Sequence, residues 1–161
     1  MNHIISNTAV ISPKADIEIS NSGLKLYIDD HTVIDAFVKI KFSGFADIRI
    51  GRRCYINSGC VLYCGNGITM GDNVIIAANC TFAGINHAYS NHKIPIRDQG
   101  FLPSKGGILI ENDVWIGAGC VFLDGAVVRS GCVIAANSLI KGECKSNGIY
   151  AGAPAQFLRY R

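Results

Sequence analysis

The sequence of 161 residues lacks any apolar stretch close to the ~20 residues that a membrane-spanning helix needs. Its first residues, MNHIISNTAVISPKAD, contain no basic region followed by an apolar run, so they do not predict a secretory signal. A net charge of +3 is too small to indicate a nucleic-acid partner. None of the seven cysteines forms a C-x-x-C pair, which argues against a zinc cluster of that type. These absences predict a cytoplasmic protein without a membrane span.

The dominant pattern in the sequence is a six-residue repeat. Four positions after each large apolar marker the residue is nearly always small, and three positions after it stands Gly or Asn in eight of twelve repeats. Gly and Asn tolerate the positive φ of a sharp corner. This combination predicts an all-β fold, a parallel β-helix. The markers are Ile50, Ile56, Leu62, Met70, Ile76, Phe82, Ile110, Ile116, Phe122, Val128, Ile134 and Ile140.

Three repeats make one triangular coil, and the breaks in the pattern all fall between coils. The steps Ile40 to Ile50, Leu62 to Met70 and Phe82 to Ile110 are longer than six residues, so all three insertions leave from one corner. We therefore expect one domain over 1–161, with about five coils and a projecting loop at 83–107. Residues 1–27 are expected to form a loose opening, in which Ile11 and Ala15 start an incomplete coil. A cap at 149–161, ending in a short helix, is expected to cover the last strand edges.

Six of the seven cysteines occupy the small inward position of the repeat. A cysteine in a core behaves as a small hydrophobic residue, so we interpret these six as structural. Cys64 is out of phase with the repeat and is expected to face outward.

A regular prism offers flat faces, so chemistry is expected in the loop or in clefts between prisms. The loop contains His87 within the run GINHAY. Histidine is the side chain best suited to accept a proton near neutral pH.

Four segments resemble the hexapeptide-repeat acetyltransferases: residues 70–80, His87, residues 110–117 and the closing Ala-Gly-Ala-Pro at 151–154. The resemblance extends from about residue 50 to the end, roughly two-thirds of the chain. It is to the branch with maltose, galactoside and nodulation-factor O-acetyltransferases and streptogramin and chloramphenicol acetyltransferases. The loop pattern His-x4-His-x-Ile-Pro-Ile is similar to that of capsule and O-antigen acetyltransferases.

The resemblance implies a left-handed β-helix that works as a homotrimer and transfers acetyl directly from acetyl-CoA to a sugar or polysaccharide hydroxyl, without a metal. His87 matches the general base of the family, and Asn57 and Trp115 match residues of the substrate cleft. Contacts to the coenzyme map to Ala118, Ala136, Lys141 and Arg159. The chain lacks the N-terminal helical segment of relatives that act on small sugars, Gln156 replaces a common Arg, and Lys141 replaces a common Thr, so the acceptor is expected to differ from maltose or galactosides.

Three other functions remain open. An N-acetyltransferase acting on an amino sugar or drug has the same fold, although His87 favours transfer to oxygen. A γ-carbonic-anhydrase-like zinc enzyme has two histidines five residues apart, as His87 and His92 are. A non-catalytic assembly subunit needs neither a loop base nor a coenzyme signature.

Overall fold

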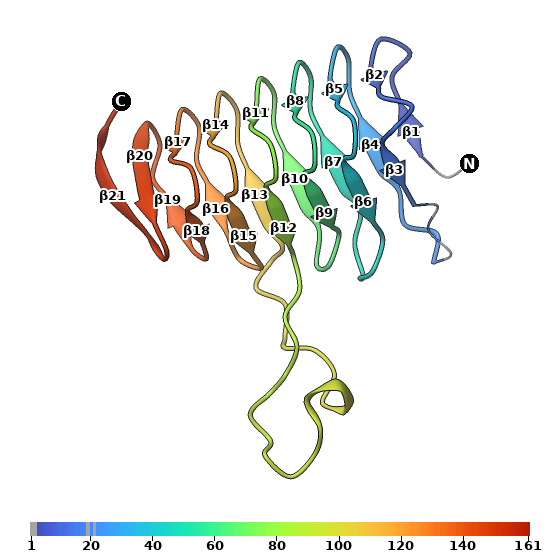
Figure 1. The fold of residues 1–161 in the computed structure, drawn as a ribbon, viewed down its shortest axis with the longest axis vertical. Helices are drawn as coiled ribbons and strands as arrows, with labels where there is room; N and C mark the ends of the chain where they lie inside the picture. Colours follow the sequence, from blue (N-terminus) through green and yellow to red (C-terminus); the bar gives the residue numbers. More distant parts are fainter. Residues whose placement is uncertain (1–2, 19, 21) are drawn as a thin grey trace.

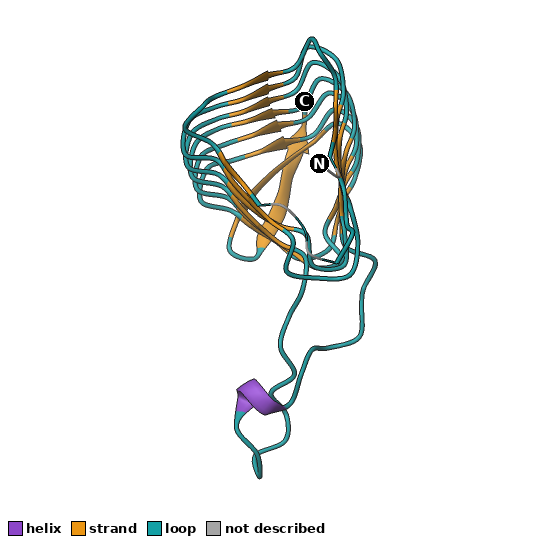
Figure 2. Ribbon diagram, turned by 90° about the vertical axis from the view of Figure 1, so that its right-hand side faces the viewer, coloured by secondary structure: helices purple, strands orange, loops and turns teal. Residues whose placement is uncertain are grey.

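Short strands of two or three residues form wherever a marker residue points inward, and each is followed by a corner that turns the chain. In the computed structural model, which describes residues 3–18, 20 and 22–161, these strands stack into a parallel β-helix with the chain ends at opposite ends of the prism (Figure 1). Figure 2 shows its triangular cross-section, with the long loop projecting from one corner.

The strands form three sheets, which we call A, B and C. Sheet A contains β1 (Ile4–Ile5), β4 (Leu26–Ile28), β7 (Ile48–Ile50), β10 (Ile68–Met70), β13 (Ile108–Ile110), β16 (Val127–Val128) and β19 (Glu143–Cys144). Sheet B contains β2 (Val10–Ile11), β5 (Val33–Ile34), β8 (Tyr55–Ile56), β11 (Ile75–Ile76), β14 (Trp115–Ile116), β17 (Val133–Ile134), β20 (Gly148–Gly152) and β21 (Ala155–Tyr160). Sheet C contains β3 (Asp16–Ile17), β6 (Lys39–Lys41), β9 (Val61–Tyr63), β12 (Thr81–Ala83), β15 (Val121–Leu123) and β18 (Leu139–Ile140).

The hexad register predicted from the sequence is confirmed. Marker residues pair with marker residues in neighbouring coils, for example Ile56 with Ile76 and Ile76 with Ile116. All twelve markers are buried, and in the middle of the core the rings of Phe82 and Phe122 stack with centroids 4.7 Å apart. The interior is therefore a column of aliphatic and aromatic layers, one per coil.

Positive φ occurs at all eight Gly and Asn positions predicted to need it. It also occurs at the equivalent corner positions His31, Phe37, Arg53 and Asp113, of which Phe37 and Arg53 do not favour this conformation. The stacking of corners on corners therefore overrides the local preference of Phe37 and Arg53.

The cysteine prediction is confirmed for six residues and wrong for one. The six in-phase cysteines are buried, and five of them donate their S–H to a backbone carbonyl of the next coil at 3.1–3.2 Å. Cys64 is buried as well, not outward. The reason is that the alternation of β9 continues past Leu62, and the corner insertion begins only at Gly65.

Both chain ends differ from the prediction. The opening contains a coil of three strands, β1 to β3, each paired in parallel with the coil above. Its inward residues Ile5, Ile11 and Ile17 keep the six-residue step but are only partly covered, because they lie in the terminal coil. The predicted C-terminal helix is wrong: residues 155–160 form β21, which pairs antiparallel with β20 and so occupies the strand edge that would otherwise be open.

The three insertions leave from one corner, as predicted. They connect β6 to β7, β9 to β10 and β12 to β13, which is the corner between sheets C and A. The longest spans 84–107 and contains one 3-10 turn, η1 (Ile96–Asp98). Within the described part of the chain, no helix has the length and apolarity of a membrane span.

Candidate functional site

His87 lies in the neck of the projecting loop, close to the prism. Its neighbours form an antiparallel bridge with the returning strand of the loop: the Ala88 amide donates to Gly100 (3.0 Å) and the Leu102 amide donates to Asn86 (2.8 Å). The imidazole packs against the ring of Phe101, with centroids 4.7 Å apart, and is otherwise exposed. It makes no side-chain hydrogen bond within the described residues, so neither ring nitrogen has a partner there.

The returning end of the loop is anchored by Asp124, a residue that the sequence did not single out. Its carboxylate is 5% exposed and accepts the amides of Lys105 and Gly107, both at 2.8 Å. The Gly125 amide in turn donates to Gly107 (2.7 Å). The only sign of its role in the sequence is its place two positions after the inward marker Phe122. In a strand every second side chain points to the same face, so this charged residue is directed inward.

The outer part of the loop is ordered by its own contacts. The side chain of Gln99 bridges the loop, accepting the Asn91 amide (3.0 Å) and donating to the carbonyls of Asn91 (2.8 Å) and Ile94 (3.1 Å). Tyr89, Ile94 and Ile96 nevertheless remain exposed to solvent. The loop is thus a defined projection with apolar side chains that its own chain does not cover.

The corner between sheets B and C gathers three of the predicted residues. Asn57, Ala118 and Ala136 occupy corners that follow β8, β14 and β17, and the Asn57 side chain donates to the Ile76 carbonyl (2.8 Å). The Ala118 carbonyl accepts the Asn137 amide (2.8 Å). The amides of Ala118 and Ala136 donate to no backbone acceptor in the described chain, so two N–H groups stand available one coil apart.

Trp115 lies next to this corner on the outer face of sheet B. It is 57% exposed and stands in register between Ile75 and Val133. With Tyr55 and Ile75 below it, the indole forms an exposed apolar row along the sheet.

Lys141 and Arg159 are not at this corner. Lys141 follows β18 at the corner between sheets C and A, and with Gln156 it lines a hollow of about 320 Å³ under the C-terminal hairpin. Arg159 lies in β21 opposite Ile149, and its guanidinium donates to the Tyr160 carbonyl (3.3 Å). A coenzyme bound at the B–C corner would therefore reach Lys141 and Arg159 only by extending across the end of the prism.

A single chain does not bring His87 together with Trp115. The loop leaves from the C–A corner, and sheet B is the face of the triangle opposite that corner (Figure 2). Asn57 is at the far end of sheet C from the loop. The predicted residues therefore form two half-sites on opposite sides of the prism.

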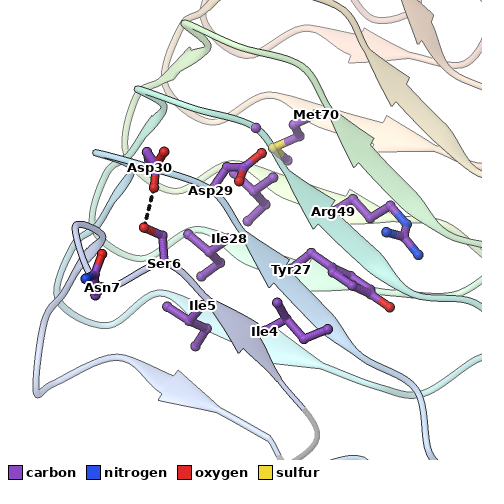
Figure 3. Close-up of a pocket in the computed structure, with 12 residues that line it drawn as sticks. Ile4, Ile5, Ser6, Asn7, Tyr27, Ile28, Asp29, Asp30, Arg49 and Met70 are labelled. Atoms are coloured by element: carbon purple, nitrogen blue, oxygen red, sulfur yellow. Dashed lines mark hydrogen bonds between the residues drawn. The ribbon is translucent and has the colours of Figure 1, made fainter.

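A surface hollow of about 510 Å³ lies elsewhere, on sheet A near the N-terminus (Figure 3). There the Arg49 guanidinium stacks over the Tyr27 ring at 3.8 Å, and Ser6 donates to Asp30. None of the predicted site residues lines this hollow.

Three of the buried thiols, those of Cys64, Cys120 and Cys144, are poor nucleophiles. Burial raises the pKa of Cys64 to about 11 and that of Cys144 to about 12, and a hydrogen bond with Cys80 together with burial raises the pKa of Cys120. A raised pKa keeps each group as the unreactive thiol at neutral pH. In the described residues no group of three or more His, Cys, Asp or Glu side chains is arranged to hold a metal ion.

Two models of hexapeptide repeats match the chain. The model for bacterial transferase hexapeptide (six repeats) matches residues 107–142, and the model for the hexapeptide repeat of succinyl-transferase matches residues 47–81. The chain belongs to the hexapeptide-repeat transferase family. The predicted resemblance is thereby confirmed, as is the predicted fold class, an all-β left-handed parallel β-helix.

This hexapeptide-repeat protein is similar to proteins of more than one activity. Galactoside O-acetyltransferase of Escherichia coli K12 is 32% identical over 120 residues, 74% of this chain and 57% of that protein. Mitochondrial gamma carbonic anhydrase 2 of Arabidopsis thaliana is 32% identical over 133 residues, 78% of this chain and 48% of that protein. The chain thus spans about half the length of these relatives.

The fold is shared with AntD, an N-acyltransferase from Bacillus cereus whose crystal structure contains dTDP and 3-hydroxybutyryl-CoA. The two superpose with a TM-score of 0.81 at 24% sequence identity, over 96% of this chain and 81% of AntD.

Proposed function

We propose that this hexapeptide-repeat protein is an acetyl-CoA-dependent O-acetyltransferase that acts on a hydroxyl of a sugar or polysaccharide. The observation that supports this most is His87, an exposed imidazole with free nitrogens on an ordered neck. The same function is supported by the similarity to a galactoside O-acetyltransferase and to an acyltransferase whose crystal structure contains a CoA thioester.

His87 acts as the general base in a direct transfer. It takes the proton of the acceptor hydroxyl while that oxygen forms a bond with the carbonyl carbon of the thioester. The carbon–sulfur bond then breaks, and coenzyme A leaves as a thiolate that regains a proton from the imidazolium. A positioned base contributes typically ~10²–10⁴ in rate, and the binding of both substrates in one cleft adds to this through proximity.

The coenzyme lies along the B–C corner. The free amides of Ala118 and Ala136 suit the amide carbonyls of the pantetheine arm, and the Trp115 indole flanks the cleft. The cationic side chains of Lys141 and Arg159 suit the phosphates of the nucleotide end. Asn57 contacts the acceptor. The transfer needs no metal, because the leaving thiolate is stable without one.

The active unit is a homotrimer in which each site draws on two chains. This follows from the two half-sites on opposite sides of one prism: the loop with His87 reaches the B–C corner of a neighbouring copy. The exposed apolar side chains of the loop, Tyr89, Ile94 and Ile96, meet a surface there instead of solvent.

Mixed subunits test this arrangement. A His87→Ala chain and a Trp115→Ala chain, each weak on its own, are denatured together and refolded as a mixture. A shared site predicts that activity returns, because some interfaces then combine a wild-type His87 with a wild-type Trp115. A mixture no more active than the average of the two parents contradicts the shared site.

The acceptor and the bond formed are tested by one assay. A panel of monosaccharides, amino sugars and cell-surface oligosaccharides is incubated with acetyl-CoA, and free coenzyme A is measured. Hydroxylamine then cleaves an O-acetyl ester but leaves an N-acetyl amide intact. An ester product supports the proposal, an amide product establishes N-transfer, and the absence of both turnover and acetyl-CoA binding indicates a non-catalytic assembly subunit.

Zinc-dependent carbonic anhydrase chemistry is the second candidate, favoured by the similarity to the plant protein and by the spacing of His87 and His92. Elemental analysis of the purified protein and a CO₂ hydration assay separate the two functions. One zinc per site with CO₂ hydration overturns the acetyltransferase proposal.

A further inference from the structure

The three insertions at the C–A corner pack on one another as a pedestal for the loop. The Phe45 amide donates to the Gly65 carbonyl (2.7 Å), and the Asn66 amide donates to the Gly84 carbonyl (2.9 Å). A Cβ added to Gly44 would overlap the backbone of Gly65, and a Cβ on Gly65 would overlap that of Gly84. Backbone therefore rests directly on backbone from the first insertion to the start of the loop.

Phe45, in the first insertion, projects from this pedestal toward the neck of the loop. Its ring meets the ring of Phe101 edge to face, with centroids 6.3 Å apart and planes at 79°. Both rings are well exposed, 70% and 49%, so their contact is not a by-product of core packing. The hydrophobic core lies on the other side of the backbone, so it does not hold Phe45 in this position.

Phe101 in turn holds the imidazole of His87. Their rings are 4.7 Å apart with planes tilted by 37°, and the two residues face each other across the antiparallel bridge. A catalytic histidine usually has its ring direction fixed by a hydrogen bond to one nitrogen. In the described chain His87 has no such bond, and the Phe101 ring is the side chain that defines its orientation.

We propose that Phe101 is the positioning residue of His87 and that Phe45 fixes Phe101 to the prism. This inference rests on the proposed role of His87 as the base. A hydrophobic positioning contact leaves both imidazole nitrogens open, one for the acceptor hydroxyl and one for solvent or the partner subunit. It also couples the base to a short insertion at the prism rather than to the outer part of the loop.

The test compares Phe101→Ala, Phe101→Tyr and Phe45→Ala with Tyr27→Ala, a control that removes a ring of similar size on sheet A. Misplacing a catalytic group by about 1 Å costs on the order of 10²-fold in rate. We expect kcat to fall by about 10- to 100-fold in Phe101→Ala and less in Phe45→Ala. The KM for acetyl-CoA should not change, and Phe101→Tyr and Tyr27→Ala should stay within about threefold of the wild type.

Two readouts separate orientation from folding. The ring-proton resonances of His87 should lose the ring-current shift of Phe101 in Phe101→Ala, while the elution volume in gel filtration stays that of the wild type. If Phe101→Ala fails to fold, Phe101→Leu preserves the volume without the ring and is expected to show the same loss of kcat. The double variant His87→Ala/Phe101→Ala should be no slower than His87→Ala alone, because Phe101 acts only through His87.

Failure of this inference is distinct from failure of the proposed function. If His87→Ala is inactive but Phe101→Ala matches Tyr27→Ala, or if the His87 resonances do not move, the positioning role is wrong and the base assignment stands. If His87→Ala keeps its activity, the proposed function itself is wrong, and so is the positioning role that depends on it.

Discussion

Asp124 gives the sharpest test of how the loop is held. Its buried carboxylate accepts two backbone amides, from Lys105 and Gly107, at 2.8 Å each. In Asp124→Asn one oxygen still accepts an amide, but the new NH₂ group faces the other N–H donor. The variant loses one hydrogen bond to a charged group and leaves a buried donor unpaired, which costs about 1.5–3 kcal/mol. For a chain of this length each kcal/mol lowers Tm by about 2–4 °C, so we expect a fall of about 3–12 °C.

The assay is thermal unfolding by circular dichroism at fixed protein concentration, because the Tm of an oligomer depends on concentration. The matched control is Asp113→Asn, an exposed corner residue with φ of 56° whose carboxylate pairs with Arg161 at 2.9 Å. Asn tolerates positive φ, and an exposed ion pair contributes little, so the control should stay close to the wild type. Equal Tm values for Asp124→Asn and the wild type would refute the idea that this carboxylate anchors the loop.

Three further predictions concern the prism. Phe122→Ala removes a fully buried ring that stacks on Phe82 and should destabilise the protein by about 3–5 kcal/mol, measured by urea unfolding; a cost below about 1 kcal/mol would show that the core is not packed this way. All seven thiols, Cys120 included, should react slowly with Ellman's reagent in the native state and fast in guanidinium, because they are buried; rapid native labelling would contradict the inward assignment. A hydrogen bond from Arg129 lowers the pKa of Glu111, so this carboxylate stabilises the fold above its unfolded pKa of about 4.3 and the contribution is lost as pH falls through the lower folded value. Glu111→Gln should therefore flatten the fall of Tm between about pH 5 and pH 3, and an unchanged slope would exclude this source of acid sensitivity.

The repeat made the prism predictable because each inward residue obeys the same local rule. Marker, small residue and corner recur in fixed order, so burial at Ile76 or Cys120 follows from position alone. The rule failed where the chain departs from it. Cys64 lies at the start of an insertion, where the inward and outward alternation of β9 continues past the end of the strand. Positive φ at Arg53 is imposed by neighbouring coils and not by the residue itself.

The ends and the loop were less predictable for another reason. In the first coil, Ile5 and Ile11 follow the six-residue step and Ala9 and Ala15 occupy the small position, but Thr8 and Lys14 stand where other repeats have the corner Gly or Asn. The tail became a strand because β20 offers it an open edge, which is a property of the assembled prism. The contact of His87 with Phe101 joins residues across an irregular loop, and no periodic pattern in the sequence reports such a contact.

The central claim, that His87 is the base of an acetyl transfer, is tested most directly by His87→Ala, measured for turnover and for acetyl-CoA affinity. In the proposed arrangement the coenzyme lies at Trp115, Ala118 and Ala136, and the imidazole contacts the acceptor oxygen. We therefore expect kcat to fall by about 10²–10⁴ while the Kd for acetyl-CoA, measured by calorimetry, stays within about twofold of the wild type. A variant that keeps more than about a tenth of the normal kcat would contradict the account, because that loss is smaller than positioned base catalysis provides.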